Sequence, residues 1–262
     1  MKHLSGTSWL ISALLLLGGC GGREASVPPQ TLDIAGNWQF SATSAVLGTP
    51  AVTIAGGINE SGISVSGAVH VDGSNCFDHL TTVDLTGTLT GSNISLTSVS
   101  VDGQVFTFTG SIADNALTGT YAINGGCASG DQGTIKGIRV PSITGTLNDT
   151  FTTTGQETFA GVAEVTQGSF SSVGTFGLTG TVAFDNPCFD SGTIKSGTFP
   201  SGSFIIGTTV ALQIETSNGT ITFLGTANQT TGEISGEYTV LGGSCDQTGT
   251  AVLVNASGPW DY

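Results

Sequence analysis

One cysteine motif occurs twice in this chain, and this repetition limits the possible folds more than any other feature. The first copy is Cys76-Phe77-Asp78, followed downstream by Cys127, and the second is Cys188-Phe189-Asp190, followed by Cys245. Segments of the same kinds, in the same order, separate the two cysteines of each copy. The chain is therefore predicted to contain two copies of one structural unit, each with its own cysteine pair.

Apolar residues alternate with Ser and Thr throughout both copies. In residues 63–71, for example, the apolar face runs from Ile63 to Val71, and the opposite face consists of Ser64, Ser66, Ala68 and His70. A period of two indicates β-strands with one buried and one solvated face. The segment that begins at Phe176 repeats this pattern in the second copy.

A glycine stands near the middle of the apolar face in many of these segments, as at Gly87, Gly119 and Gly236. Glycines in strands mark bends or close backbone approaches, and repeated around a sheet they allow it to close into a barrel. Turn signals such as Asn124-Gly125 indicate hairpins between antiparallel neighbours. Eight strands are expected in each copy, and those of the first copy should begin near Gly36, Pro50, Gly62, Thr82, Asn93, Gln104, Ala116 and Gln132.

The predicted fold is therefore all-β, with two tandem antiparallel eight-stranded up-and-down β-barrels. The first barrel is expected over residues 36–140 and the second over residues 141–256, followed by a C-terminal tail of residues 257–262. An eight-stranded barrel is either filled by its own side chains or holds one small ligand. Each half has a common domain size and its own strand set, so each is expected to fold alone.

The charge balance of the chain excludes some partners. Charged residues make up only 9% of the chain and hydrophobic residues 38%, whereas disordered chains usually combine high charge with low hydrophobicity. Nineteen acidic residues outnumber five Lys and Arg residues, and the basic residues form no cluster. Nucleic acid is therefore not an expected partner, because its phosphates are bound through Lys and Arg.

The N-terminal residues form a processing signal. Lys2 precedes an apolar stretch, residues 9–17, which is too short to span a bilayer as a mature helix. The stretch ends in Leu17-Gly18-Gly19-Cys20, which resembles the lipobox of bacterial lipoproteins. The resemblance implies that residues 1–19 are a signal peptide and that Cys20 becomes the lipidated N-terminus.

The lipobox resemblance also implies a cellular location for the protein. We expect an exported protein held on the membrane through its lipid anchor, with residues 20–35 serving as the lipidated cysteine and its linker. Gly21 follows the cysteine where some Gram-negative inner-membrane lipoproteins have Asp, so the resemblance favours the outer membrane.

The other four cysteines allow three pairings. The duplication favours Cys76–Cys127 and Cys188–Cys245, one bond in each barrel. In an up-and-down barrel the loops after the third and seventh strands emerge at the same end, which permits this pairing. Closing a loop of about 50 residues should contribute about 4 kcal/mol in the chain-entropy description. A metal site is the competing interpretation, although the sequence has no C-x-x-C motif.

The start of the first copy, Gly36-Asn37-Trp38, resembles the G-x-W start of lipocalins and avidin-like barrels, where the Trp packs at the closed end. The second copy keeps the glycine as Gly145 but has no Trp. Biotin binding is rejected because avidins stack several Trp on biotin, and this chain offers only Trp38 in its predicted barrels. The whole chain is similar to uncharacterised lipocalin-like bacterial lipoproteins, a resemblance that implies a fold and no activity.

The sequence offers little acid–base chemistry. It contains no nucleophile elbow, zinc-protease motif or P-loop, so no enzyme activity, catalytic residue or cofactor is predicted. His70 is expected on a solvated strand face and His79 in a loop. Asp78 and Asp190 are interpreted as turn-capping residues, with Ca²⁺ ligation as the alternative, and no metal site is predicted.

The sequence supports two functional hypotheses equally. In the first, the protein is a non-catalytic binding module whose barrels hold a small apolar ligand or present loops to a cell-surface partner, and a cavity of roughly 300 Å³ or more would favour it. In the second, it is a structural lipoprotein with filled barrels. Phe77 and Phe189 are expected to plug the barrel mouths, and no ligand-binding residue is predicted. A single 16-strand outer-membrane barrel is a less favoured third reading.

Overall fold

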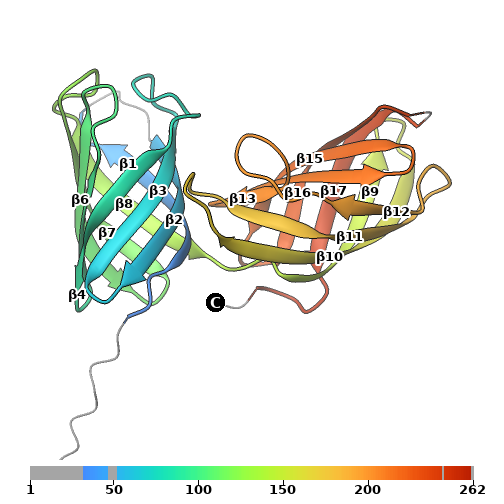
Figure 1. Cartoon of the computed structure of the whole chain (residues 1–262), viewed down its shortest axis with the longest axis horizontal. Coiled ribbons are helices and arrows are strands. Elements are labelled where there is room, and N and C mark those ends of the chain that lie inside the picture. The colour runs from blue at the N-terminus through green and yellow to red at the C-terminus, as the bar shows by residue number, and fades with distance from the viewer. Residues whose placement is uncertain (1–31, 47–51, 244, 261–262) are drawn as a thin grey trace, which may run out of the picture. The chain divides into compact units, whose positions relative to one another are not determined.

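The computed structural model describes residues 32–46, 52–243 and 245–260 (Figure 1). Within these residues the regular secondary structure is entirely β-strand, and the strands form two closed antiparallel barrels. The predicted fold class is therefore confirmed. Cys20 and the predicted processing signal lie outside the described residues, so both the signal and the lipidation stay predictions.

The first barrel is an eight-stranded meander in which each strand pairs with the next along the chain. It closes where β1 pairs with β8. The predicted strand starts agree with the observed ones to within two residues. The strands are β1 (Gly36–Ser44), β2 (Val52–Ser61), β3 (Ser64–Asp72), β4 (Val83–Thr90), β5 (Asn93–Ser98), β6 (Val105–Ala113), β7 (Ala116–Asn124) and β8 (Gln132–Val140).

The second barrel repeats this meander with one addition. It closes through the pairing of β17 with β9, and the short strand β13 pairs with both β11 and β14. Because the strands close into two separate rings, the reading as one 16-strand barrel is wrong. The strands are β9 (Gly145–Thr153), β10 (Thr158–Phe170), β11 (Phe176–Asp185), β12 (Ser191–Ile194), β13 (Phe204–Ile206), β14 (Thr209–Thr216), β15 (Gly219–Asn228), β16 (Glu233–Leu241) and β17 (Gln247–Asn255).

Paired glycines bring neighbouring strands close together on the inner face of each barrel. Gly110 on β6 lies opposite Gly119 on β7, and Gly225 on β15 lies opposite Gly236 on β16. A Cβ atom at Gly119 would stand 2.2 Å from the carbonyl oxygen of Thr109. Any side chain there would push the two backbones apart, so glycine permits the tight curvature that closes the barrel.

Two positions on β3 and its preceding turn differ from the alternating pattern. Ile63, expected on the buried face, is 68% exposed because it belongs to the turn between β2 and β3. His70, expected in solvent, is only 7% exposed. Its side chain does leave the barrel interior, but Val173 and Phe199 of the second half cover it. Its Nε2 lies 2.9 Å from the Val173 carbonyl oxygen, and its ring lies 4.7 Å from that of Phe199.

A second contact between the two halves involves the outer face of β1. The Asn37 side chain donates from Nδ2 to the Gly207 carbonyl oxygen at 2.8 Å and accepts from the Gly207 amide at 2.7 Å. Gln39 Oε1 accepts a hydrogen bond from the Thr208 amide at 3.1 Å. Asn37 is buried, and this reciprocal pair satisfies both of its polar ends, as buried amides require.

An apolar cavity in the first barrel

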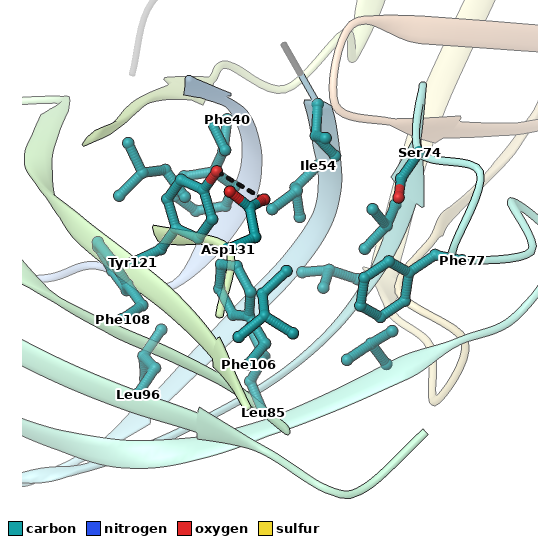
Figure 2. Close-up of a pocket in the computed structure, with 17 residues that line it drawn as sticks. Phe40, Ile54, Ser74, Phe77, Leu85, Leu96, Phe106, Phe108, Tyr121 and Asp131 are labelled. Atoms are coloured by element: carbon teal, nitrogen blue, oxygen red, sulfur yellow. Dashed lines mark hydrogen bonds between the residues drawn. The ribbon is translucent and has the colours of Figure 1, made fainter. Parts of the chain in front are cut away.

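The inner faces of the first-barrel strands leave an apolar cavity of about 40 Å³. Figure 2 shows Leu85, Leu96 and Phe106 among the side chains around it. The cavity is larger than the space of one water molecule but well below the roughly 300 Å³ of a drug-sized pocket. By itself it therefore does not reach the size that the binding hypothesis calls for, and it has room only for a short and slim apolar group.

Three polar side chains form a hydrogen-bonded group at the cavity. The Tyr121 hydroxyl on β7 donates to Asp131 Oδ2 at 3.1 Å (Figure 2), and the Ser44 hydroxyl at the end of β1 donates to Asp131 Oδ1. Burial, followed by the hydrogen bond to Asp131 and its negative charge, raises the pKa of Tyr121 to about 12. Tyr121 is therefore a protonated donor at neutral pH, and Asp131 is the one charged residue among the cavity-lining residues.

A wider hollow of about 340 Å³ lies at the loops of the same barrel end. It contains the Cys76–Cys127 disulfide and shares Val52, Ser74 and Asp131 with the cavity. Phe77, predicted to plug the mouth, is half-buried and lines the cavity. The hollow reaches the roughly 300 Å³ that the binding hypothesis calls for. The narrow apolar cavity therefore adjoins a broader mouth of mixed polar and apolar lining, and Asp131 lines both spaces.

The second barrel is filled by aromatic side chains at the corresponding place. β1 and β9 both begin with glycine and run for nine residues, so Ala42 corresponds to Phe151. Ala42 pairs with Val52 across β1 and β2, whereas Phe151 pairs with Phe159, and their rings stack at 4.8 Å. A small residue thus leaves space in the first barrel where two phenyl rings occupy it in the second.

Phe189 completes this aromatic filling. It is 1% exposed, and its ring lies 5.1 Å from that of Phe184 and 5.8 Å from that of Phe159. Tyr238 packs edge-on against Phe151 at 5.2 Å. The expectation that Phe189 plugs its barrel thus agrees with its position in the core of the second barrel.

A carboxyl group lies inside this filled barrel. Asp149 on β9 occupies the position that corresponds to Phe40 on β1, and it is 3% exposed. Its Oδ1 has no hydrogen-bond partner among the described residues. Burial raises the pKa of Asp149 from its ordinary value of 3.8 to about 7, because the apolar surroundings disfavour the charged form.

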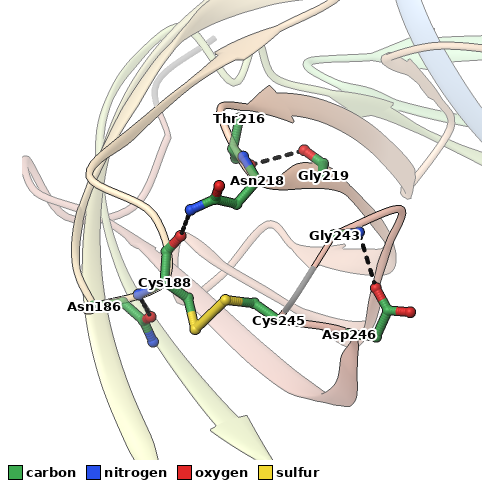
Figure 3. The surroundings of a disulfide bond; sticks show 8 residues. All are labelled: Asn186, Cys188, Thr216, Asn218, Gly219, Gly243, Cys245 and Asp246. Carbon is green, nitrogen blue, oxygen red and sulfur yellow. Dashed lines mark hydrogen bonds between the residues drawn. A yellow bond between two sulfur atoms is a disulfide. The ribbon is translucent and has the colours of Figure 1, made fainter.

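Both predicted disulfides are confirmed. The Cα atoms are 5.5 Å apart in Cys76–Cys127 and 5.9 Å apart in Cys188–Cys245. Around the second bond, Asn218 donates to the Cys188 carbonyl oxygen and the Cys188 amide donates to Asn186 Oδ1 at 2.7 Å (Figure 3). Disulfides persist in oxidising compartments, so these two bonds favour an extracellular or periplasmic protein.

The other predicted loop residues lie away from the cavity lining. Asp78 accepts a hydrogen bond from the Leu80 amide at 3.0 Å, which supports the turn-capping interpretation, and Asp190 is exposed. The His79 Nδ1 atom lies 3.6 Å from Asp78, and both side chains are mostly exposed. In the described part of the chain, no group of three or more His, Cys, Asp or Glu side chains is placed to hold a metal ion.

Sequence reasoning missed the residues that distinguish the two barrels. Asp131 and Ala42 carry no local motif, and neither was singled out. Counting from Gly36 and Gly145 would have indicated the difference between Ala42 and Phe151. No such signal exists for Asp131, because Asp-Gln occurs in both copies, at 131–132 and 246–247, and only the strand register matches Asp131 with Gln247.

Comparisons with known proteins assign no family. No protein-family model and no curated protein matches this chain. Among solved structures, the chain is similar to the crystal structure of kievitone hydratase from Nectria haematococca. The match has 11% sequence identity and a TM-score of 0.24, and it covers 87% of this chain and 91% of that one. Such a TM-score supports no conclusion about fold or activity. No helix among the described residues is long and apolar enough to cross a membrane.

Proposed function

We propose that this protein is a non-catalytic lipoprotein whose first barrel binds a small, largely apolar ligand. The observation that carries the proposal is the apolar cavity together with the adjoining hollow. In the second barrel, aromatic rings occupy the place that corresponds to this cavity. The apolar part of the ligand occupies the space above Ala42, and its polar part lies in the hollow beside the disulfide. Burial of the apolar part supplies most of the affinity, at about 25 cal/mol per Å² of apolar surface.

The second barrel has a structural role in this proposal. Its aromatic core leaves no counterpart of the Ala42 space, and its loops support the outer face of the first barrel through Gly207 and Val173. The structural hypothesis expects a barrel filled by side chains, which describes the second barrel. The binding hypothesis expects a cavity, so it applies to the first barrel. Presentation of loops to a cell-surface partner is the alternative role for the second barrel.

Membrane attachment through Cys20 is part of the proposal. The lipobox resemblance supports it, and so do the disulfides, which suit an exported chain. Metabolic labelling with an alkyne analogue of palmitate should label the wild-type protein and not Cys20→Ser. Equal labelling of both proteins, or of neither, would contradict the anchor without bearing on ligand binding.

The binding proposal is tested by filling the cavity with the side chain that the second barrel uses. Ala42→Phe should weaken the binding of 1-octanol, measured by isothermal titration calorimetry, by at least about tenfold, because the ring occupies the ligand space. Ala113→Phe, at an exposed position on β6, is the matched control and should bind like the wild type. Circular dichroism checks that both variants are folded. Unchanged affinity in a folded Ala42→Phe protein would refute the site.

A further inference from the structure

We infer that Asp131 makes the first barrel selective for small apolar amines, bound as ammonium ions, over carboxylic acids of the same length. The inference rests on the proposed binding function and adds the chemical class of the ligand. A lipocalin-like cavity without this group would distinguish ligands mainly by size and apolar surface. Here the polar end of the ligand lies beside the negatively charged carboxylate of Asp131.

Among the described residues, the cavity lining contains a negative charge and no positive one. Its 17 residues include Asp131 but no Lys, Arg or His. A ligand carboxylate would lie beside the Asp131 carboxylate with no cation in the lining to compensate. Like charges held together in a partly buried site repel, whereas an ammonium group pairs with the carboxylate. The net charge of the whole chain, −14, adds to the preference through its longer-range field.

Asp131 also has free hydrogen-bonding capacity. An ionised carboxylate offers about four lone-pair sites. The side chains of Ser44 and Tyr121 donate one hydrogen bond each, to different oxygens. These two donors hold the carboxylate in position beside the cavity and leave acceptor sites for a ligand. An ammonium group donates up to three hydrogen bonds and accepts none, so it suits a site whose charged group is an acceptor.

The location of Asp131 matches the shape of an alkylamine. It lines both the apolar cavity and the wider hollow, so an alkyl chain in the cavity leads its terminal nitrogen toward the carboxylate. The corresponding residue of the second barrel is the uncharged Gln247, and the stacked rings of Phe151 and Phe159 occupy the place that corresponds to Ala42. The carboxylate at this register position and the cavity therefore occur together in the first copy. In the second copy the buried carboxyl, Asp149, lies at a different position, which corresponds to Phe40.

The test compares three ligands of equal chain length by calorimetry on the purified full chain at pH 7.5. Octylamine should bind at least about tenfold more tightly than octanoate, since a hydrogen bond to a charged group contributes enough for such a ratio. Octanol should fall between them. In Asp131→Asn the affinities for the three ligands should converge. Asp78→Asn removes the same charge from a mouth loop outside the cavity lining and should keep the wild-type order.

The outcomes separate this inference from the proposed function. If all three ligands bind the wild type equally, or octanoate binds most tightly, the selectivity is refuted and the binding function stands. If none of the three binds, the binding function itself fails. The wild-type comparison needs no variant, so a misfolded Asp131→Asn protein would leave the inference testable. A folded Asp131→Asn protein that keeps the full preference for octylamine would show that another group provides it.

Discussion

The buried carboxyl of Asp149 should make the stability of this protein fall as the pH rises. Its pKa is raised from 3.8 to about 7, a difference of about 3 units, and each unit corresponds to 1.36 kcal/mol. In the unfolded chain the carboxyl ionises near pH 4, whereas in the folded barrel it stays protonated up to about pH 7. Folding is therefore penalised progressively between these two values, by up to about 4 kcal/mol above pH 7.

Replacing Asp149 by Asn removes the titration while keeping the size and polarity of the side chain. Urea unfolding should be followed at several pH values between 4 and 8, with fluorescence of Trp260, which is buried in the core of the second barrel, as the local probe. The free energy of unfolding of Asp149→Asn minus that of the wild type should increase by up to about 4 kcal/mol from pH 4 to pH 8. Any change that burial of the Asn amide makes to the free energy of unfolding is independent of pH, and this amount cancels when the differences at two pH values are compared.

Asp190→Asn is the matched control, because it removes an exposed carboxyl from the same barrel. Its free energy of unfolding should follow that of the wild type across the whole pH range. If wild type and Asp149→Asn show the same pH dependence, Asp149 ionises inside the barrel as it does in water. The assignment of the pKa shift to burial would then be wrong.

Three further perturbations test the fold. Gly119→Ala should destabilise the first barrel by about 1–3 kcal/mol in urea unfolding, since its Cβ would overlap the neighbouring strand, whereas Gly155→Ala, which has ordinary contacts, should change stability little. Replacing both Cys76 and Cys127 by Ser should lower the free energy of unfolding by about 4 kcal/mol relative to the wild type under oxidising conditions. Under full reduction the variant and the wild type should be equally stable. Asn37→Ala leaves buried groups of the second half unpaired, which should cost about 1–3 kcal/mol and separate the unfolding transitions of the two barrels. A single unchanged transition would show that these hydrogen bonds do not couple them.

The sequence by itself determined the strand set, the closure into two barrels and the cysteine pairing. These depend on local periodicity and on repetition. A two-residue alternation sets which side chains face inward, and glycines such as Gly119 mark where neighbouring backbones meet. The duplication favoured the pairing of Cys76 with Cys127, and strand order permitted it, because a meander returns its alternate loops to the same end.

Only the tertiary structure decided which barrel has space and which surfaces are covered. Ala42 and Phe151 are both apolar and inward-facing, so the alternation of apolar residues does not distinguish them. The volume of a cavity depends on the summed volume of all the side chains that meet inside the barrel. His70 points out of its own barrel, yet Val173 and Phe199 cover it. Asp131 becomes a candidate ligand group only because Ser44, distant in sequence, and Tyr121, on the preceding strand, hold it beside the cavity. Such properties arise from contacts between strands far apart in the chain, and periodicity along one strand carries no information about them.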